Sequence, residues 1–344
     1  MGTLRELVKQ YILDNIKTED FSNRTLARKM CEEQPEIFGE PNPKNIDRIR
    51  FAIRVVRDAA GTKLTRNRIK NPIFVRAEQK PSEYMASFMA KTNHESNKPK
   101  HWTLPKQHAK VLVMSDIHFP HHTMSALGAA LDFGIQQNID GIYLNGDIID
   151  FKSISRWDKE PDTIRLADEI EMLKEFLDML MGFDVPIYYK LGNHEDRYYK
   201  KLLKDAPELF DLPDFKIEKI LGLEERGIPL IDTRTRAMFG RLTVVHGHEF
   251  GESIFSPVNP ARGLFMKAKA DILAGHHHQR SQHQESDIRG QKTRCYSTGC
   301  LCDLEPNYRP FAFTKWNHGA AIVEVGGEDF SVLNFGIEGS RIVF

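Results

Sequence analysis

Five short polar motifs in this 344-residue chain carry side chains that bind divalent metals. In chain order they are Asp116-Ile117-His118, Gly146-Asp147, Gly192-Asn193-His194-Glu195, His246-Gly247-His248 and Gly275-His276-His277-His278. A single Asp-x-His pair or a lone histidine is common on protein surfaces, but five such motifs in order indicate one shared site. The mixture of imidazole nitrogen, carboxylate and amide oxygen suits Mn, Fe or Zn better than Mg or Ca. The sequence therefore predicts a transition-metal centre.

The chemistry that fits these residue types is hydrolysis of a phosphate ester. This reaction needs a strong nucleophile at neutral pH and positive charge beside the phosphoryl oxygens as they become more anionic. Two divalent ions roughly 3.5–4 Å apart supply both, provided that one carboxylate can bridge them. The glycines within the motifs permit tight turns, so that several ligands can converge on one point.

The elements that must position these motifs are buried strands. Apolar runs predict strands at Lys110–Met114, Gly141–Leu144, Pro186–Tyr189, Leu242–Val245 and Asp271–Ala274, each followed closely by one motif. An amphipathic helix is expected from Asp162 to Met181, and aromatic and β-branched residues from Thr293 onward predict further strands. This alternation indicates an α/β fold, and open α/β folds build their sites beyond the carboxyl ends of strands.

The order and spacing of the motifs resemble the calcineurin-like metallophosphoesterase superfamily over about residues 108–280. Its motifs are D-x-H, G-D, G-N-H-[ED], H and G-H-x-H. The resemblance implies a four-layer sandwich in which two mixed β-sheets are flanked by helices. It also implies two divalent ions as cofactors, for which we expect Mn, with Fe, Zn or Ni as alternatives.

The ligands of both ions follow from the same resemblance. One ion would be held by Asp116, His118, Asp147 and His278, and the other by Asp147 as the bridge, Asn193, His246 and His276. His194 would be catalytic and not a ligand, because it would lie over the phosphate and stabilise the transition state or protonate the leaving oxygen.

Several neighbours of the motifs receive weaker assignments. Arg197 and Arg262 are predicted to contact the substrate phosphate. His248 and His277 are expected only to line the site, and Asp150 to support Asp147 or a loop.

Two departures from the superfamily pattern bear on the substrate. The Ser/Thr protein phosphatases of this superfamily carry arginines where this chain has Phe151 and Leu191. A protein phosphatase is therefore the least favoured alternative. The function that we predict first is that of a phosphodiesterase acting on nucleic acid, and the alternative is a phosphomonoesterase or a small-nucleotide phosphodiesterase.

The sequence of the N-terminal part of the chain predicts a separate helical domain. We expect a helix-turn-helix-like or winged-helix-like domain over residues 1–75, a linker over 76–107 and the metallophosphoesterase domain over 108–344. Helices are predicted at Leu4–Ile16, from a Ser22 or Thr25 cap through Met30, and at Asn45–Ala60.

A concentration of positive charge accompanies the third of these helices. Residues 41–80 hold eleven Lys and Arg against three Asp and Glu, although Lys+Arg and Asp+Glu are both 48 in the whole chain. Arg50, Arg54 and Arg57 share one helical face, which predicts a nucleic-acid partner bound through its phosphates. The alternative is a solvated face of a domain that holds a protein partner.

Composition excludes other classes of protein. The net charge of zero excludes a globally basic nucleic-acid binder, and neither a signal peptide nor a membrane span is evident. The four cysteines are expected to be free thiols in the cytoplasm, with a Cys-x4-Cys-x-Cys metal site at Cys295, Cys300 and Cys302 as the alternative. Assembly as a homo-oligomer is left open.

Overall fold

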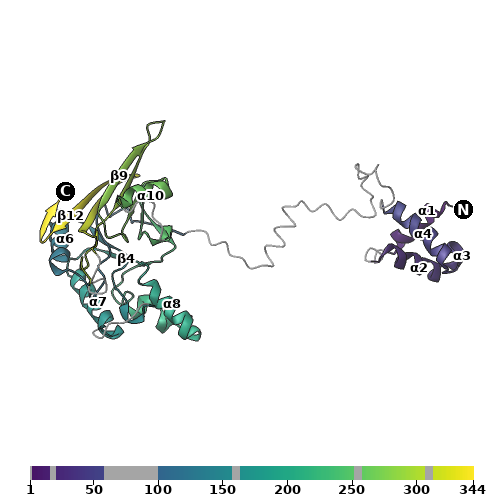
Figure 1. Cartoon of the computed structure of the whole chain (residues 1–344), viewed down its shortest axis with the longest axis horizontal. Coiled ribbons are helices and arrows are strands. Elements are labelled where there is room, and N and C mark those ends of the chain that lie inside the picture. The colour runs from purple at the N-terminus through teal and green to yellow at the C-terminus, as the bar shows by residue number, and fades with distance from the viewer. Residues whose placement is uncertain (1, 16–20, 58–99, 157–162, 252–257, 307–312) are drawn as a thin grey trace. The chain divides into compact units, whose positions relative to one another are not determined.

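The structure is a computed structural model that describes residues 2–15, 21–57, 100–156, 163–251, 258–306 and 313–344. The chain divides into two compact units, Met1–Ser96 and Asn97–Phe344 (Figure 1). Within the described residues no helix is both long and apolar enough to cross a membrane.

The first unit is a small helical bundle. Its helices are α1 (Leu4–Asp14), α2 (Asn23–Glu33), α3 (Pro35–Phe38) and α4 (Pro43–Val56). Ser22 caps α2 by accepting a hydrogen bond from the backbone N–H of Thr25, and Asn42 caps α4 in the same way. Apolar side chains at helical spacing form one buried core that includes Leu26, Ile49 and Ile53. Ala60, the last residue of the predicted third helix, lies outside the described residues.

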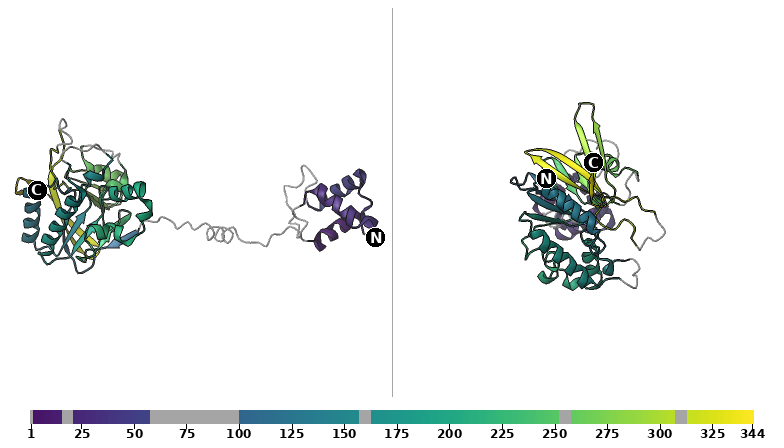
Figure 2. Two further views of the ribbon diagram at one scale, coloured as in Figure 1. Left: turned by 90° about the horizontal axis from the view of Figure 1, so that it is seen from below. Right: turned by 90° about the vertical axis from the view of Figure 1, so that its left-hand side faces the viewer.

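The second unit is a four-layer α/β sandwich (Figure 2). A seven-stranded sheet has the order β13-β12-β11-β2-β3-β4-β5, and a six-stranded sheet has the order β1-β6-β7-β8-β10-β9. The strands are β1 (Lys100–Thr103), β2 (Lys110–Met114), β3 (Gly141–Asn145), β4 (Ile187–Lys190), β5 (Leu230–Ile231), β6 (Thr235–Phe239), β7 (Leu242–Val245), β8 (Ile272–Ala274), β9 (Ser281–Ser286), β10 (Lys292–Ser297), β11 (His318–Gly326), β12 (Asp329–Glu338) and β13 (Arg341–Val343). The helices are α6 (Met124–Gln136), α7 (Leu166–Met181), α8 (Asp196–Asp205), α9 (Ile217–Ile220) and α10 (Pro260–Ala268), with 3-10 turns at Lys152–Ile154, Pro207–Leu209, Pro213–Phe215 and His248–Phe250.

The alternation of side chains along the central strands produces the layers. In β2, Val111 and Val113 point into the core between the two sheets, whereas Leu112 and Met114 face the helices. The helices α6 and α7 cover this outer face of the seven-stranded sheet, and α10 covers the outer face of the other sheet. Strands buried on both faces appear in a sequence as continuous apolar runs. All five predicted strands are accordingly confirmed, with ends that differ by at most one residue.

One strand lies where the sequence predicted a linker. β1 pairs in parallel with β6, and the Trp102 ring lies 4.9 Å from the Tyr188 ring in the core between the sheets. Residues from Lys100 onward therefore belong to the catalytic unit. The rest of the predicted linker, residues 76–99, lies outside the described residues.

Candidate metal centre

The strand ends bring all five motifs to one buried place. The motifs follow β2, β3 and β4 in one sheet and β7 and β8 in the other, so the two sheets contribute to a single site. Five of the seven predicted ligands have positive backbone φ angles, which residues other than glycine rarely adopt. They are Asp116 (56°), His118 (55°), Asp147 (52°), His276 (69°) and His278 (56°). Such strain persists where the surrounding structure enforces it, and it concentrates at functional sites.

One group of side chains surrounds the Asp116 carboxylate. Nε2 of His278 lies 3.1 Å from Oδ1 of Asp116 and 3.2 Å from Nε2 of His118. The same His118 nitrogen lies 3.9 Å from Oδ2 of Asp147. These donors match the set that the superfamily resemblance implies for the first ion.

A second group adjoins the first through Asp147. Nε2 of His246 lies 3.2 Å from Oδ2 of Asp147. One ligand atom each of Asp147, His246 and His276 lie within 4.8 Å of one another. Nδ1 of His246 is 2.8 Å from the carbonyl oxygen of Asn145, so Nε2 is the nitrogen directed into the group. That Nε2 and Oδ1 of Asn193 are both buried without a hydrogen-bond partner. Unpaired buried polar atoms are costly, and a cation would satisfy both, so the residues fit a metal here.

Two glycines allow the loops to approach this closely. A Cβ atom at Gly192 would lie 2.3 Å from Oδ1 of Asp147. A Cβ atom at Gly275 would lie 2.3 Å from Oγ of Ser115 and 2.6 Å from Oδ2 of Asp116. Any side chain at either position would displace a carboxylate of the centre.

Glu195 fixes two of the ligand loops to each other. Its buried carboxylate accepts hydrogen bonds from the backbone N–H groups of Asp147 (3.0 Å), Ile148 (2.8 Å) and Gly192 (2.8 Å), and from the hydroxyl of Tyr189 (2.9 Å). Burial and the Asp147 charge raise the pKa of Glu195, whereas the backbone N–H donors lower it. Three backbone N–H groups bonded to its two oxygens favour the ionised form. No role was predicted for Glu195 from the sequence, although it stands inside a motif.

A buried ion pair holds the loop that carries His246. Nζ of Lys190 lies 3.2 Å from Oε1 of Glu249, and this lysine is fully buried. The Glu249 carboxylate accepts hydrogen bonds from the N–H groups of His246 (3.2 Å) and Gly247 (2.6 Å). Burial raises the pKa of Glu249, but the Lys190 charge outweighs it and lowers the pKa to about 2. The ionised Glu249 thus positions this turn.

Asp150 orients two imidazoles, which refines its predicted role. Its Oδ1 lies 3.2 Å from Nδ1 of His118 and 2.7 Å from Nδ1 of His194. A carboxylate on Nδ1 fixes the ring so that Nε2 points toward the centre. Nε2 of His194 lies 3.8 Å from Oδ2 of Asp147 and 2.8 Å from Nη2 of Arg197. The structure therefore places His194 and Arg197 beside the centre.

The electrostatics of the centre attract positive charge. Burial raises the pKa of Asp147, but the His194 and His246 rings outweigh this effect and hold the pKa well below its usual range. Burial lowers the pKa of His246, but the Asp147 carboxylate outweighs it and raises the pKa to about 10. Burial and the His246 charge lower the pKa of His276 to about 3. Metals bind ionised carboxylates and neutral imidazoles, so a metal entering this centre would displace the proton that the raised pKa places on His246.

A basic cleft opens beside the second group. Its volume is about 540 Å³, and the described residues that line it are Ile154, Ser155, Arg156, Asn193, Arg197, Lys200, Lys201, Lys204, His248, Gly251 and His276. None of these is acidic. His248 lines the cleft as predicted, whereas Arg262 is exposed in the first turn of α10 and is not among these lining residues.

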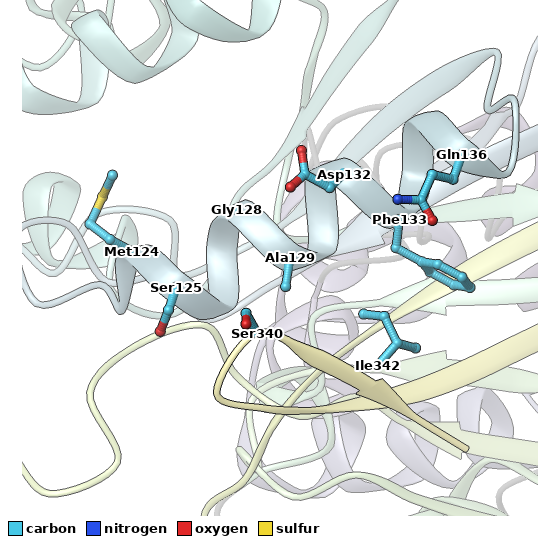
Figure 3. Close-up of a pocket in the computed structure, with 9 residues that line it drawn as sticks. All are labelled: Met124, Ser125, Gly128, Ala129, Asp132, Phe133, Gln136, Ser340 and Ile342. Carbon is cyan, nitrogen blue, oxygen red and sulfur yellow. The ribbon is translucent and has the colours of Figure 1, made fainter.

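A second pocket, of about 350 Å³, lies along α6 and contains none of the predicted ligands (Figure 3). Asp132 is its one charged side chain among the described residues. The basic cleft, by contrast, is lined by Asn193 and His276 of the predicted ligand set.

The cysteines and the phosphatase positions are buried. The four cysteines are free thiols, as predicted. Cys302 adjoins the centre: its Sγ lies 3.7 Å from Nδ1 of His278, and one ligand atom each of His118, His278 and Cys302 lie within 4.8 Å of one another. Phe151 and Leu191 belong to the hydrophobic core, so no cation reaches the phosphate from these two positions.

In the first unit, Arg57 contributes to the fold. Its Nη1 donates hydrogen bonds to the carbonyl oxygen of Phe21 (2.9 Å) and to Oδ1 of Asn23 (2.7 Å), which ties the end of α4 to the start of α2. Arg50 lies 3.5 Å from Oδ1 of Asp47, one turn earlier on α4, and Arg54 is exposed. Arg57 thus helps to hold the helices together, and phosphate binding by Arg50, Arg54 and Arg57 stays a prediction.

Fold and site together define a metal-dependent phosphoesterase. The family model described as calcineurin-like phosphoesterase matches residues 109–309. The chain belongs to this family and is a hydrolase acting on phosphate esters, as the motifs predicted.

Relatives of the chain include two phage proteins. The gene 54 proteins of Mycobacterium phages D29 and L5 are 28% and 25% identical to it, covering 63% and 64% of this chain and 89% and 90% of theirs. Among solved structures, vacuolar protein sorting 29 from Cryptosporidium parvum matches at 12% identity and a TM-score of 0.36, covering 69% of this chain and 95% of its own. A dimetal phosphatase from Danio rerio matches at 12% identity and a TM-score of 0.35, covering 66% and 96%.

Proposed function

We propose that this enzyme hydrolyses phosphodiester bonds in nucleic acid. The observation that carries the proposal is the cleft beside Asn193 and His276, whose described lining includes five basic side chains and no acidic one. A cleft of one sign of charge concentrates ligands of the opposite sign. A polyanion with phosphates on both sides of the scissile bond fits such a lining better than a single phosphate group does.

Asp147, His194 and Arg197 would each have a distinct role in the proposed reaction. When bound, two divalent ions would supply the nucleophile and neutralise the growing charge on the phosphoryl oxygens. Asp147 stands between the two ligand groups and would bridge the ions. His194, which Asp150 holds by Nδ1, would present Nε2 to the leaving oxygen. Arg197 now contacts that same Nε2 and would turn to the substrate phosphate.

The metal that we propose is Mn. The donor set of carboxylates, imidazoles and one amide oxygen is typical of Mn, Fe and Zn sites. We also propose that the N-terminal unit binds the nucleic-acid backbone through Arg50 and Arg54, with protein docking as the competing role for this face.

A substrate panel tests the proposal. Protein loaded with Mn should be assayed on a chromogenic monoester, a chromogenic diester, labelled single-stranded and duplex DNA, RNA and a cyclic nucleotide. We expect hydrolysis of the chromogenic diester and of nucleic acid, with little turnover of the monoester. Efficient turnover of the monoester or the cyclic nucleotide alone would replace the proposal by a phosphomonoesterase or a small-nucleotide phosphodiesterase.

A further inference from the structure

One face of α8 carries four basic residues. Arg197, Lys200, Lys201 and Lys204 recur at i, i+3, i+4 and i+7, so they lie along one side of the helix. α8 begins directly after the motif that contains Asn193 and His194, and this position fixes the face relative to the centre. The spacing is visible in the sequence, but nothing in the sequence alone shows which way the face points.

Exposed lysines on a helix are ordinarily only solvated, but two observations distinguish this face. First, all four basic residues line the same cleft as Asn193 and His276, which belong to the metal centre. Second, among the described residues only Lys201 of the three lysines has an ion pair, with Asp205 (2.5 Å). Among the described lining residues, positive charge is thus directed at the cleft with no acidic side chain to match it.

We propose that Lys200, Lys201 and Lys204, here called the α8 lysine face, bind consecutive phosphates of the strand on one side of the scissile bond. This inference rests on the proposed function, because it concerns how a nucleic-acid substrate lies in the cleft. With a rise of 1.5 Å per residue, Lys200 and Lys204 are separated by about 6 Å along the helix axis. Phosphates of one strand recur about every 3.4 Å along a duplex axis, so two or three phosphates match this length.

The residues that line the cleft also indicate that the α8 lysine face does not recognise the bases of the strand. No Phe, Tyr or Trp is present among the described residues of the cleft, and such rings are what most single-strand binders use to stack bases. Lysine is a flexible point charge, which suits phosphate contacts of no fixed geometry. Recognition through phosphates alone carries no sequence information. We therefore expect base composition and the 2′-hydroxyl to affect cleavage little.

Substrate length tests the inference. Cleavage of single strands from two to about twelve nucleotides should be compared in wild type and in the Lys200→Gln/Lys201→Gln/Lys204→Gln variant. For wild type, kcat/KM should rise over the first two or three added phosphates and then level off. In the variant this rise should disappear, and the ratio of strand to chromogenic-diester efficiency should fall roughly tenfold or more.

Two matched variants separate charge from folding. Lys106→Gln/Arg289→Gln/Lys292→Gln removes the same charge from exposed positions outside the cleft lining, and it should keep the wild-type ratio. Lys200→Arg/Lys201→Arg/Lys204→Arg keeps the charge on α8 and should keep the length dependence. In chelator, the affinity of the Gln variant for a labelled strand should fall less steeply with salt, by about 0.7 log–log units per lost contact.

The outcomes distinguish the two proposals. Wild-type length dependence in the α8 Gln variant, or an equal loss in the control triple, would overturn the lysine-face inference while leaving the proposed function intact. A wild-type enzyme that hydrolyses the chromogenic monoester but no strand of any length would overturn the proposed function itself.

Discussion

Replacing Glu195 by Gln should damage the metal centre without changing the volume of any side chain. Each oxygen of the Glu195 carboxylate accepts two hydrogen bonds, Oε1 from Ile148 and Tyr189 and Oε2 from Asp147 and Gly192. Glutamine keeps one oxygen and turns the other into an NH₂ donor. Donors that faced an acceptor would then face a donor.

The loss in stability can be worked out from the less damaging of the two orientations of the side-chain amide in Glu195→Gln. With NH₂ toward Tyr189 and Ile148, the tyrosine hydroxyl can rotate and accept, but the buried N–H of Ile148 loses its partner. An unsatisfied buried donor costs about 1–3 kcal/mol, and bonds to a neutral oxygen are weaker than bonds to a carboxylate. We expect a loss of about 2–4 kcal/mol in the free energy of unfolding of the catalytic unit. Metal affinity should fall about 10–100-fold, as is typical when a supporting group is changed.

Urea unfolding of the metal-free protein and titration with Mn²⁺ measure these two quantities. Glu208→Gln is the control, because it removes the same charge from an exposed residue. If Glu195→Gln matched the control in both stability and metal affinity, Glu195 would not be what holds the Asp147 and Gly192 loops together.

Three further predictions concern other parts of the molecule. His194→Ala should retain both metals and lose roughly 10²–10⁴ in rate, whereas His278→Ala should lose metal as well as activity. Bound metal is measured by elemental analysis, and equal metal loss in the two variants would contradict the role of His194. Arg50→Gln/Arg54→Gln should weaken binding to long DNA and lower the salt dependence of that binding by about 0.9 log–log units per lost phosphate contact. Turnover of a chromogenic diester should stay the same. Unchanged DNA binding would favour the protein-docking alternative. Burial and the nearby Asp150 charge raise the pKa of Glu169 to about 7, so the folded state binds more protons than the unfolded state between pH 4.5 and 7, and stability falls as pH rises through this window. Glu169→Gln should therefore raise Tm at pH 8, by roughly 2–4 °C per kcal/mol recovered, and change it little at pH 4; equal shifts at both pH values would contradict this.

The sequence was most informative where one physical requirement dominates. β2, β3, β4, β7 and β8 are buried on both faces or nearly so, and their apolar runs predicted them to within one residue. The ligand motifs were recognisable because metal chemistry restricts the residue types and the strand ends restrict their positions. Which of these residues bind each ion stays a prediction, although the structure brings all of them together.

Other features depend on contacts that no local pattern contains. β1 and β9 are edge strands of polar sequence, KHWT and SQHQES, and they exist because a neighbouring strand pairs with them. Arg57 was predicted to bind phosphate, and only the structure shows that its Nη1 also bonds to Phe21 and Asn23, which lie far away in the sequence. The supporting roles of Lys190 and Glu195 could be suspected from their neighbourhood to the motifs, but only the folded structure shows their partners.

If a dinuclear metal centre built on Asp147 hydrolyses phosphodiester bonds in nucleic acid, cleavage should depend on both ions. The deciding experiment follows the cleavage rate of a labelled DNA strand by metal-free protein as Mn²⁺ is added back, with bound metal counted at each step. We expect no cleavage without metal, a rate that levels off at two bound ions per chain, and almost no activity at any metal concentration in Asp147→Asn. Full activity in the metal-free protein, or in Asp147→Asn, would rule this mechanism out.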